Sequence, residues 1–201
     1  MIASLLTLSR ADYKALKITD TYSIHRIVYS LFPKKDGIAR NFLFADKGGD
    51  FNSRKILILS QDYPDKPEIG SIESKVINDS FLNYDFYGFE VLVNPVKRDN
   101  KTGKLVGIRG KEELLAWFIK KSPSFGFSLD PISLTVSDTD IVQFKKDKGT
   151  VTFGKAKFTG KLEVTDRELF KKSFCNGIGK AKGFGFGLLQ IVPLTKASAD
   201  A

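Results

Sequence analysis

Residues 20–33 read DTYSIHRIVYSLFP, and this segment decides how the first half of the chain folds. Its apolar side chains recur at the three- and four-residue spacing of a helix. They are Ile24, Ile27, Val28, Leu31 and Phe32. Asp20 or Thr21 can cap the first turn, and Pro33 closes the last one. We therefore predict one helix across this segment.

Strand-like segments flank the helix. Apolar residues predict one strand at 2–8 and two more at 41–44 and 55–59, joined through Gly-Gly-Asp. The remaining predicted elements of this half are a turn at 34–37, a loop at 62–70, a short helix or turn at 71–74 and a strand at 75–82. The order β-α-β-β-(α)-β is that of a ferredoxin-like unit.

The second half repeats this outline. Its predicted elements are a strand at 87–96 with Phe89, Val91 and Val93 on one face, a basic hairpin at 97–109, a helix at 111–121, strands at 132–137, 141–145 and 150–164, a helix at 165–176 and a strand at 186–194. Thr165-Asp-Arg-Glu168 has the capping-box pattern, and a left-handed cap is favoured at Gly177. We therefore predict two α+β halves joined near residues 83–88.

The charge of the chain is uneven. The net charge is +9, yet residues 1–88 carry 12 basic and 11 acidic side chains, whereas residues 89–201 carry 20 and 12. A one-sided basic excess is typical of proteins that bind a polyanion. No basic amphipathic helix with an apolar insertion face is visible, so the sequence favours nucleic acid over an acidic membrane. A solvated basic surface is the alternative.

Composition excludes several classes of site. The chain has one cysteine, Cys175, and one histidine, His25, so neither an internal disulfide nor a Cys/His zinc site can form. Carboxylates do not cluster convincingly, and we expect no metal or cofactor. No apolar run reaches the roughly 18 residues that span a bilayer, and the apolar N-terminus predicts a strand rather than a signal peptide. We expect no membrane association and a reducing cytoplasm.

His25 is the first candidate catalytic residue. On the predicted helix it shares a face with Tyr22, three positions earlier. Histidine exchanges a proton near neutral pH, and RNA carries its own nucleophile in the 2′-hydroxyl, so one such group can drive cleavage without a metal. The alternatives are a structural or exposed histidine and a half-buried tyrosine at a helix start.

A glycine-rich loop is the second candidate site. Residues 177–187 read GIGKAKGFGFG, which matches neither the P-loop nor the dinucleotide motif in spacing or in element order. Gly177 and Gly179 allow the backbone to approach a ligand closely, and Lys180 and Lys182 suggest that the ligand is a phosphate chain. The alternative is a tight helix-to-strand crossover with solvated lysines.

The basic hairpin is the third candidate site, because two strands with a charged tip can lie along an RNA groove. Its candidate RNA-binding residues are Lys97, Arg98, Lys101, Lys104 and Arg109. Lys155 and Lys157 alternate with Phe153 and Phe158 on a later strand and could extend the same surface. A solvated loop is the alternative.

Several segments form a pattern when they are read in order. They are Tyr22-Ser-Ile-His25 through Leu31-Phe32-Pro33, Arg40-Asn-Phe-Leu-Phe44, Phe89-Glu-Val-Leu-Val-Asn94-Pro95-Val-Lys97, Gly160–Asp166 and Gly177–Leu194. The first three resemble the Y-x-L-H-x(5)-L-F-P, R-x-F-L-F and R-x-x-A-N-P-x-K segments of the CasE (Cse3) family, and the last two resemble its closing segments. Members of that family are the repeat-RNA endoribonucleases of type I-E CRISPR systems. Glu90 and Leu92 depart from the third pattern.

The resemblance implies an α+β fold of tandem ferredoxin-like (RAMP, RRM-like) domains, at residues 1–85 and 86–194, with a flexible tail at 195–201. It implies a metal-independent endoribonuclease that cuts the CRISPR repeat stem-loop RNA at the base of the stem, through 2′-hydroxyl attack that leaves a 2′,3′-cyclic phosphate and a 5′-hydroxyl. His25 falls on the family's catalytic histidine and Tyr22 on its companion tyrosine. We expect a prokaryotic cytoplasmic monomer that keeps its product and joins a Cascade-type complex. The alternative is a non-catalytic RNA-binding RAMP subunit.

Overall fold

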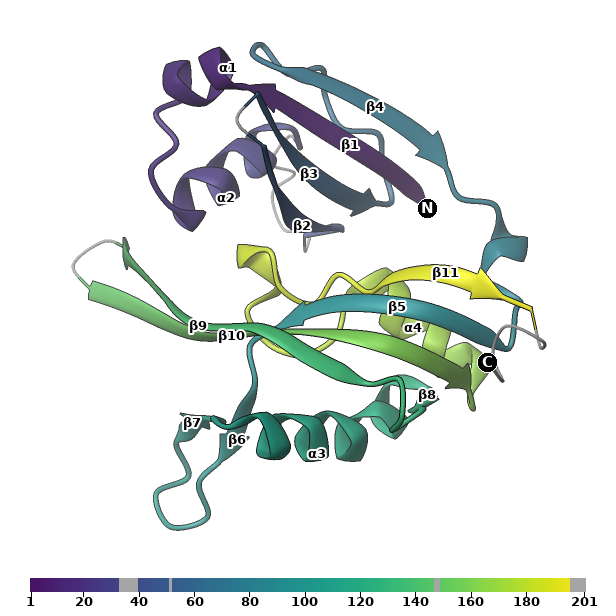
Figure 1. The fold of residues 1–201 in the computed structure, drawn as a ribbon. Coiled ribbons are helices and arrows are strands. Elements are labelled where there is room, and N and C mark those ends of the chain that lie inside the picture. The colour runs from purple at the N-terminus through teal and green to yellow at the C-terminus, as the bar shows by residue number, and fades with distance from the viewer. Residues whose placement is uncertain (33–39, 51, 147–148, 196–201) are drawn as a thin grey trace.

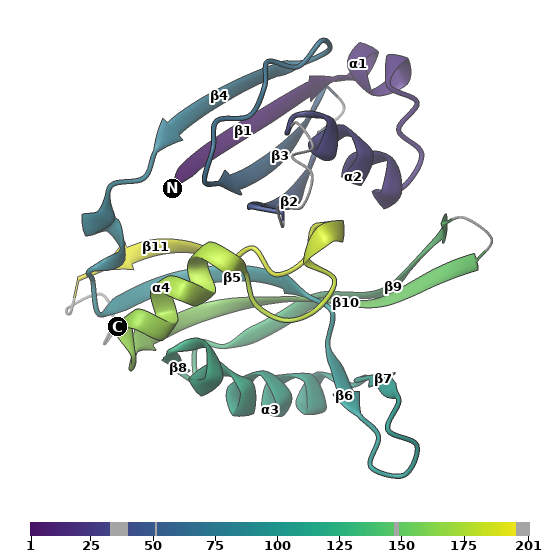
Figure 2. The ribbon, with the colours of Figure 1, turned by 180° about the vertical axis from the view of Figure 1, so that it is seen from behind.

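The computed structural model describes residues 1–32, 40–50, 52–146 and 149–195, and the predicted turn at 34–37 lies outside them. These residues form two large antiparallel sheets, one from each half of the chain, which lie one above the other in Figure 1, and a two-stranded hairpin in the second half. Seen from behind, α4 lies in front of β5, and α3 lies below the second sheet on the side away from the first (Figure 2).

The first sheet has the strand order β2-β3-β1-β4, with every neighbour antiparallel. Its strands are β1 (Ile2–Ser9), β2 (Phe42–Gly49), β3 (Ser53–Ser60) and β4 (Ser71–Val76). This is the strand order of a ferredoxin-like unit. The predicted helix or turn at 71–74 is wrong, and so is the strand at 75–82. Edge strand β4 is mostly exposed and lacks an apolar pattern, while Asn78 caps a 3₁₀ turn, η1 (Asp79–Leu82).

Two helices follow β1. The sequence pattern did not predict α1 (Arg10–Ala15), which a capping box between Ser9 and Asp12 begins. The second, α2 (Thr21–Ser30), confirms the predicted helix, and the Asp20 carboxylate caps it by accepting from the Ser23 amide at 2.8 Å.

The second sheet has the order β11-β5-β10-β8, with β9 also paired to β10. Its strands are β5 (Phe86–Val93), β8 (Phe127–Leu129), β9 (Thr135–Lys146), β10 (Gly149–Val164) and β11 (Gln190–Leu194). The other elements of this half are the hairpin β6 (Val96–Arg98) and β7 (Leu105–Gly107), helices α3 (Lys111–Lys121) and α4 (Arg167–Asn176), and 3₁₀ turns η2 (Ser122–Phe125) and η3 (Lys182–Phe184). The hairpin and α3 lie where the sequence predicts them.

Several boundaries in this half differ from prediction, and the predicted strand at 87–96 ends earlier, at Val93. The segments at 132–137 and 141–145 join into β9, which bends at Asp138 (φ 50°) instead of breaking, and short strand β8 was not predicted. Asp166, not Thr165, caps α4. Gly177 has a positive φ of 73°, but its ψ of 160° is extended. It therefore does not adopt the left-handed helical conformation that the sequence predicts for a cap. The last strand starts at Gln190, because positive-φ glycines shape the residues before it.

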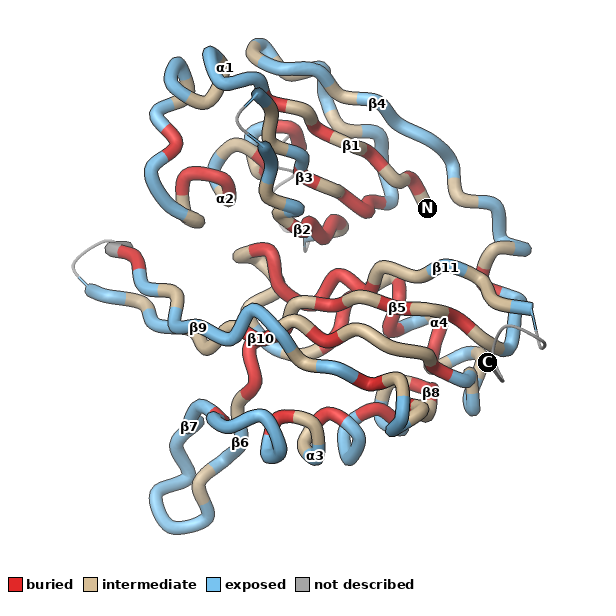
Figure 3. The backbone as a smooth tube through the Cα atoms, viewed as in Figure 1, coloured by how far each residue is buried: buried red, intermediate tan, exposed pale blue. Residues whose placement is uncertain are grey.

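One apolar cluster joins the two halves, and a second lies entirely within the first half. The first residues of β2 are buried (Figure 3). Phe42 and Phe44 pack with α2, whereas Leu43 and Ala45 join the core of the second half. Successive side chains along β2 point to opposite faces of the first sheet. The first sheet therefore lies between α2 on one face and the second half of the chain on the other. On this arrangement we propose that residues 1–85 and 86–194 are the two domains.

Candidate active site

His25 lies on α2, half-buried, and meets the glycine-rich loop of the other half of the chain. Its Nδ1 atom is 2.6 Å from the carbonyl oxygen of Gly183, 158 positions away in sequence. The imidazole also stacks on Phe184, with ring centroids 4.9 Å apart, and touches Tyr29 at 4.0 Å. The fold therefore fixes the orientation of this ring from two sides.

The Gly183 contact sets the tautomer of His25. A carbonyl oxygen only accepts hydrogen bonds, so Nδ1 must carry the proton that lies between them. The neutral ring then has its lone pair on Nε2. That arrangement suits a general base, because Nε2 can accept a proton while the backbone carbonyl stabilises the resulting imidazolium.

Tyr22 lies beside His25, as its position on α2 predicts. The two rings stack with centroids 5.3 Å apart and an interplanar angle of 14°. Phe144 of β9 covers Tyr22 at 5.5 Å, and the guanidinium of Arg26 lies 5.7 Å from its ring centroid. Tyr22 is thus a half-buried ring at the start of α2, packed between His25 and Phe144. Its role as the catalytic companion of His25 stays a prediction.

An aromatic cluster joins α2, the glycine-rich loop and the long β9–β10 ribbon. Phe184 is at its centre, 5.0 Å from Phe144 and 5.2 Å from Phe153 between ring centroids. Rings at these separations attract each other beyond the area that they bury. The cluster holds the loop carbonyl against His25.

The glycine-rich loop fits tightly between the two halves. A Cβ atom on Gly177 would lie 2.8 Å from the side chain of Leu43, and one on Gly185 would lie 3.0 Å from Phe44, both in β2. The Ile178 amide donates to the Gly187 carbonyl at 2.9 Å and closes the loop. Gly179 contrasts with these positions, since nothing lies within 4 Å of its Cβ position. The loop therefore has an open side at Gly179, where a ligand backbone has room.

Lys182 is held by the protein rather than presented to solvent. Its Nζ donates to the carbonyls of Asn176 and Gly177, at 2.9 and 3.0 Å, at the C-terminal end of α4. Burial, followed by the charges of Arg40 and Lys180, lowers the pKa of the Lys182 amine from its ordinary value. Three cations are therefore close together beside the loop, and Arg40 was not among the predicted site residues.

A basic groove of about 870 Å³ runs between the β6–β7 hairpin, α3 and the glycine-rich loop. Its basic lining residues are Lys97, Arg98, Lys120, Lys121, Lys180 and Lys182, and Gly177 and Gly179 line it too. The structure thus brings Lys97 and Arg98 of the predicted hairpin to one surface with the predicted loop residues. It adds Lys120 and Lys121, which the sequence showed only as the end of a helix. Lys101 and Lys104 are exposed on the hairpin but do not line the groove.

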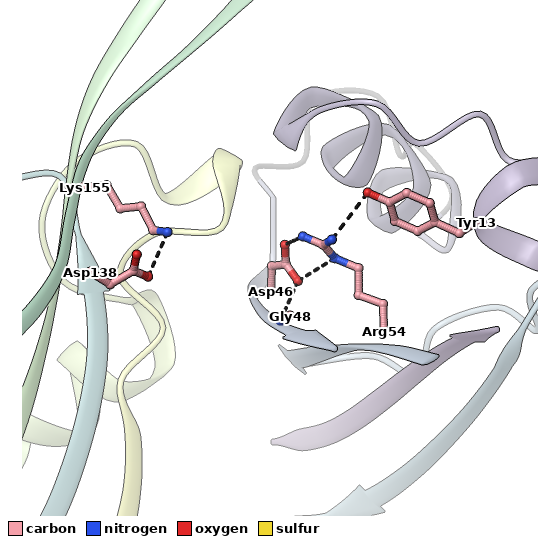
Figure 4. Close-up of polar contacts among 6 residues, drawn as sticks. All are labelled: Tyr13, Asp46, Gly48, Arg54, Asp138 and Lys155. Atoms are coloured by element: carbon pink, nitrogen blue, oxygen red, sulfur yellow. Dashed lines mark hydrogen bonds and ion pairs between the residues drawn. The ribbon is translucent and has the colours of Figure 1, made fainter. Parts of the chain in front are cut away.

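The other predicted basic residues lie elsewhere. Arg109 and Lys155 line a neighbouring groove of about 710 Å³, and Lys157 joins Lys155 in a cleft of about 200 Å³ between the two sheets. Lys155 pairs with Asp138 at 2.8 Å, as Figure 4 shows. On the facing sheet Arg54 pairs with Asp46 in the same view. Lys155 lies beside the hairpin, because Val96, Leu105 and Gly107 line the same groove, whereas Lys157 lines only the cleft between the sheets. The binding of RNA by Lys155 and Lys157 stays a prediction.

Within the described ranges, no group of three or more His, Cys, Asp or Glu side chains could hold a metal ion. None of the helices in those ranges combines the length and apolar character that a bilayer-spanning helix requires.

The fold and the site together define a class of protein. Its members have tandem ferredoxin-like domains, and a histidine on a helix of the first domain contacts a glycine-rich loop of the second. A family model described as "CRISPR associated protein" matches residues 1–193. The chain is 26% identical over 191 residues to the CRISPR system Cascade subunit CasE of Escherichia coli, an alignment that covers 87% of this chain and 93% of that protein. It is 31% identical over 116 residues to the CRISPR-associated endoribonuclease Cse3 of Thermus thermophilus, which covers 52% of this chain and 54% of that one.

Solved structures agree with the fold. A structure of Cse3 bound to 19 nt RNA superposes with a TM-score of 0.79 at 21% identity, covering 96% of this chain and 100% of that one. Cas6e from Escherichia coli superposes with a TM-score of 0.74 at 22% identity, with the same coverage. The chain belongs to the CasE (Cse3) family of CRISPR-associated proteins.

Proposed function

We propose that this protein is an endoribonuclease that cleaves CRISPR repeat RNA and needs no metal to do so. The observation that carries the proposal is the contact between His25 Nδ1 and the Gly183 carbonyl, which prepares Nε2 as a base. The relative Cse3 supports the class of reaction, since it is named a CRISPR-associated endoribonuclease and one of its structures holds RNA.

The proposed reaction uses the nucleophile that RNA supplies. Nε2 of His25 takes the proton of the 2′-hydroxyl, the 2′-oxygen bonds to the adjacent phosphorus, and the bond from phosphorus to the 5′-oxygen breaks. The leaving 5′-oxygen takes up a proton, from the imidazolium or from water. The products are a 2′,3′-cyclic phosphate and a 5′-hydroxyl. Tyr22, stacked on the imidazole, positions the ring.

The substrate is a repeat stem-loop that the enzyme cuts at the base of the stem. The basic groove brings six lysine or arginine side chains to one surface, and duplex RNA is bound mainly through phosphates, 2′-hydroxyls and shape. We propose that Lys97, Arg98 and Lys180 contact the backbone of the stem. Because the related CasE is named a Cascade subunit, we also propose that the protein holds its product within such a complex.

Single-turnover cleavage of a labelled repeat stem-loop by the native protein and by His25→Ala tests the proposal. We expect His25→Ala to cut at least about 100-fold more slowly, the usual contribution of a general base, and to bind the same RNA nearly as tightly. Tight binding without cleavage by the native protein would instead favour a non-catalytic RNA-binding subunit. Loss of binding in His25→Ala would make His25 a contact or folding residue.

A further inference from the structure

Arg40 lies beside the contact that orients His25. A Cβ atom on Gly183 would come within 2.8 Å of Arg40 Nη1 and 3.2 Å of the Tyr29 hydroxyl. Gly183, whose carbonyl accepts the hydrogen bond from His25, is therefore also the residue against which the Arg40 guanidinium lies. Only glycine leaves room for that side chain at this position.

The guanidinium is held in place by two aromatic residues. Arg40 Nη1 donates to the Tyr29 hydroxyl at 3.2 Å, and its Cζ lies 5.8 Å from the ring centroid of Phe42. The Tyr29 ring in turn touches His25. Arg40 and His25 are thus positioned by one shared tyrosine, so the distance between base and cation is fixed by packing.

The charge of Arg40 is available to an anion. Across the described ranges no carboxylate forms an ion pair with Arg40, and its side chain is exposed. Nearby cations are engaged differently. Lys182 donates to two backbone carbonyls, and Arg26 lies over the Tyr22 ring. A guanidinium cannot lose its proton in a protein, so Arg40 stays charged while His25 changes protonation state.

We propose that Arg40 is a catalytic residue that binds the scissile phosphate of the RNA and stabilises the charge that develops on it. The inference rests on the proposed function. When the 2′-oxygen attacks, a second negative charge builds up on the non-bridging oxygens of the phosphate. The planar fork of Arg40 can donate two parallel hydrogen bonds to those oxygens. Placed beside the base, Arg40 fixes the phosphate in line for attack by the oxygen that His25 deprotonates.

The test compares Arg40→Ala, Arg40→Lys and a control on exposed helix α1, Arg10→Ala, in single-turnover cleavage of a repeat stem-loop under saturating enzyme. We expect Arg40→Ala to slow cleavage about 100- to 1,000-fold, as when one preorganised oxyanion donor is removed. The affinity for RNA should change by less than about five-fold, since one phosphate contact among many is lost. Arg40→Lys should recover part of the rate, and Arg10→Ala should stay within about three-fold of the native rate.

A sulfur substitution separates a phosphate contact from a structural role. In the native protein, replacing one non-bridging oxygen of the scissile phosphate by sulfur should slow cleavage about ten-fold in one diastereomer, the effect of weakening one charge-assisted hydrogen bond. In Arg40→Ala that diastereomer should cut as fast as the all-oxygen RNA.

The outcomes distinguish the two proposals. If the native protein does not cut repeat RNA, the proposed function fails and this inference fails with it. If the native protein cuts, but Arg40→Ala keeps its rate within about three-fold or keeps the full sulfur effect, then the role of Arg40 alone is overturned.

Discussion

The glycine-rich loop gives a matched pair of substitutions that tests whether close backbone approach holds it in place. Gly179 and Gly187 both have positive φ, 74° and 81°, and both belong to the same loop. They differ in the space around them. A Cβ on Gly179 meets nothing within 4 Å, whereas one on Gly187 would lie 2.2 Å from the backbone oxygen of Ile178.

The two costs can be estimated from this geometry. Alanine with positive φ costs about 1–2 kcal/mol, and this strain applies to both variants. At Gly187 the methyl group also forces the backbone of Ile178 to move, which breaks the 2.9 Å hydrogen bond between the Ile178 amide and the Gly187 carbonyl. Leaving such buried groups without partners costs about 1–3 kcal/mol more. We therefore expect Gly187→Ala to be less stable than Gly179→Ala by roughly 2 kcal/mol.

Equilibrium unfolding in urea, followed by circular dichroism, measures this difference. Both variants should unfold with the native dependence on urea, so that the midpoints report stability directly. Unfolding free energies within about 0.5 kcal/mol of each other would refute the idea that the close approach of Gly187 to Ile178 holds the loop. In that case the aromatic cluster around Phe184 would be the main restraint.

Two further predictions concern the basic residues. The pKa of the Lys182 amine is lower in the folded protein than in the unfolded chain. Between these two pKa values the unfolded chain binds more protons than the folded protein does. The free energy of unfolding should therefore rise with pH across that interval. Lys182→Met should flatten this rise in urea titrations at pH values below 10.5, the ordinary lysine pKa, and an equal rise in both proteins would contradict the assignment. In the basic groove, Lys120→Gln and Lys121→Gln should each reduce the slope of log affinity for repeat RNA against log salt by about 0.7–0.9. Lys66→Gln, on the exposed loop of the first half, is the control, and equal slopes in all variants would move the RNA surface elsewhere.

Periodic patterns in the sequence predicted the elements that bury an amphipathic face. Helix α3 has the bounds predicted for it, and β5 shows the expected alternation, with Tyr87, Phe89, Val91 and Val93 buried. The errors fall where no such face exists. Strand β4 is an exposed edge whose hydrogen bonds to β1 hold it in place, and these depend on a partner far along the chain. The local pattern of apolar and polar residues does not predict the pairing of β4 with β1.

The candidate site shows the same limit. His25, Tyr22 and the glycine-rich loop were singled out from residue type, spacing and resemblance. The contact between His25 and Gly183 joins positions 158 residues apart, so only the folded chain shows which glycine meets the histidine. The sequence singled out Arg40 only as the first residue of the segment that resembles the family's R-x-F-L-F strand. Its neighbours, Tyr29 and Gly183, come from different halves of the protein.

The central claim is that His25 activates the 2′-hydroxyl of the RNA and that no metal takes part. The most direct measurement mixes the native protein, in EDTA, with two repeat stem-loops that differ only by a 2′-deoxy substitution at the nucleotide before the cut. We predict that the all-ribose RNA is cut to a 2′,3′-cyclic phosphate and a 5′-hydroxyl, and that the 2′-deoxy RNA is bound but stays intact. Cleavage of the 2′-deoxy RNA, or cleavage that EDTA abolishes and added Mg²⁺ restores, would contradict the account.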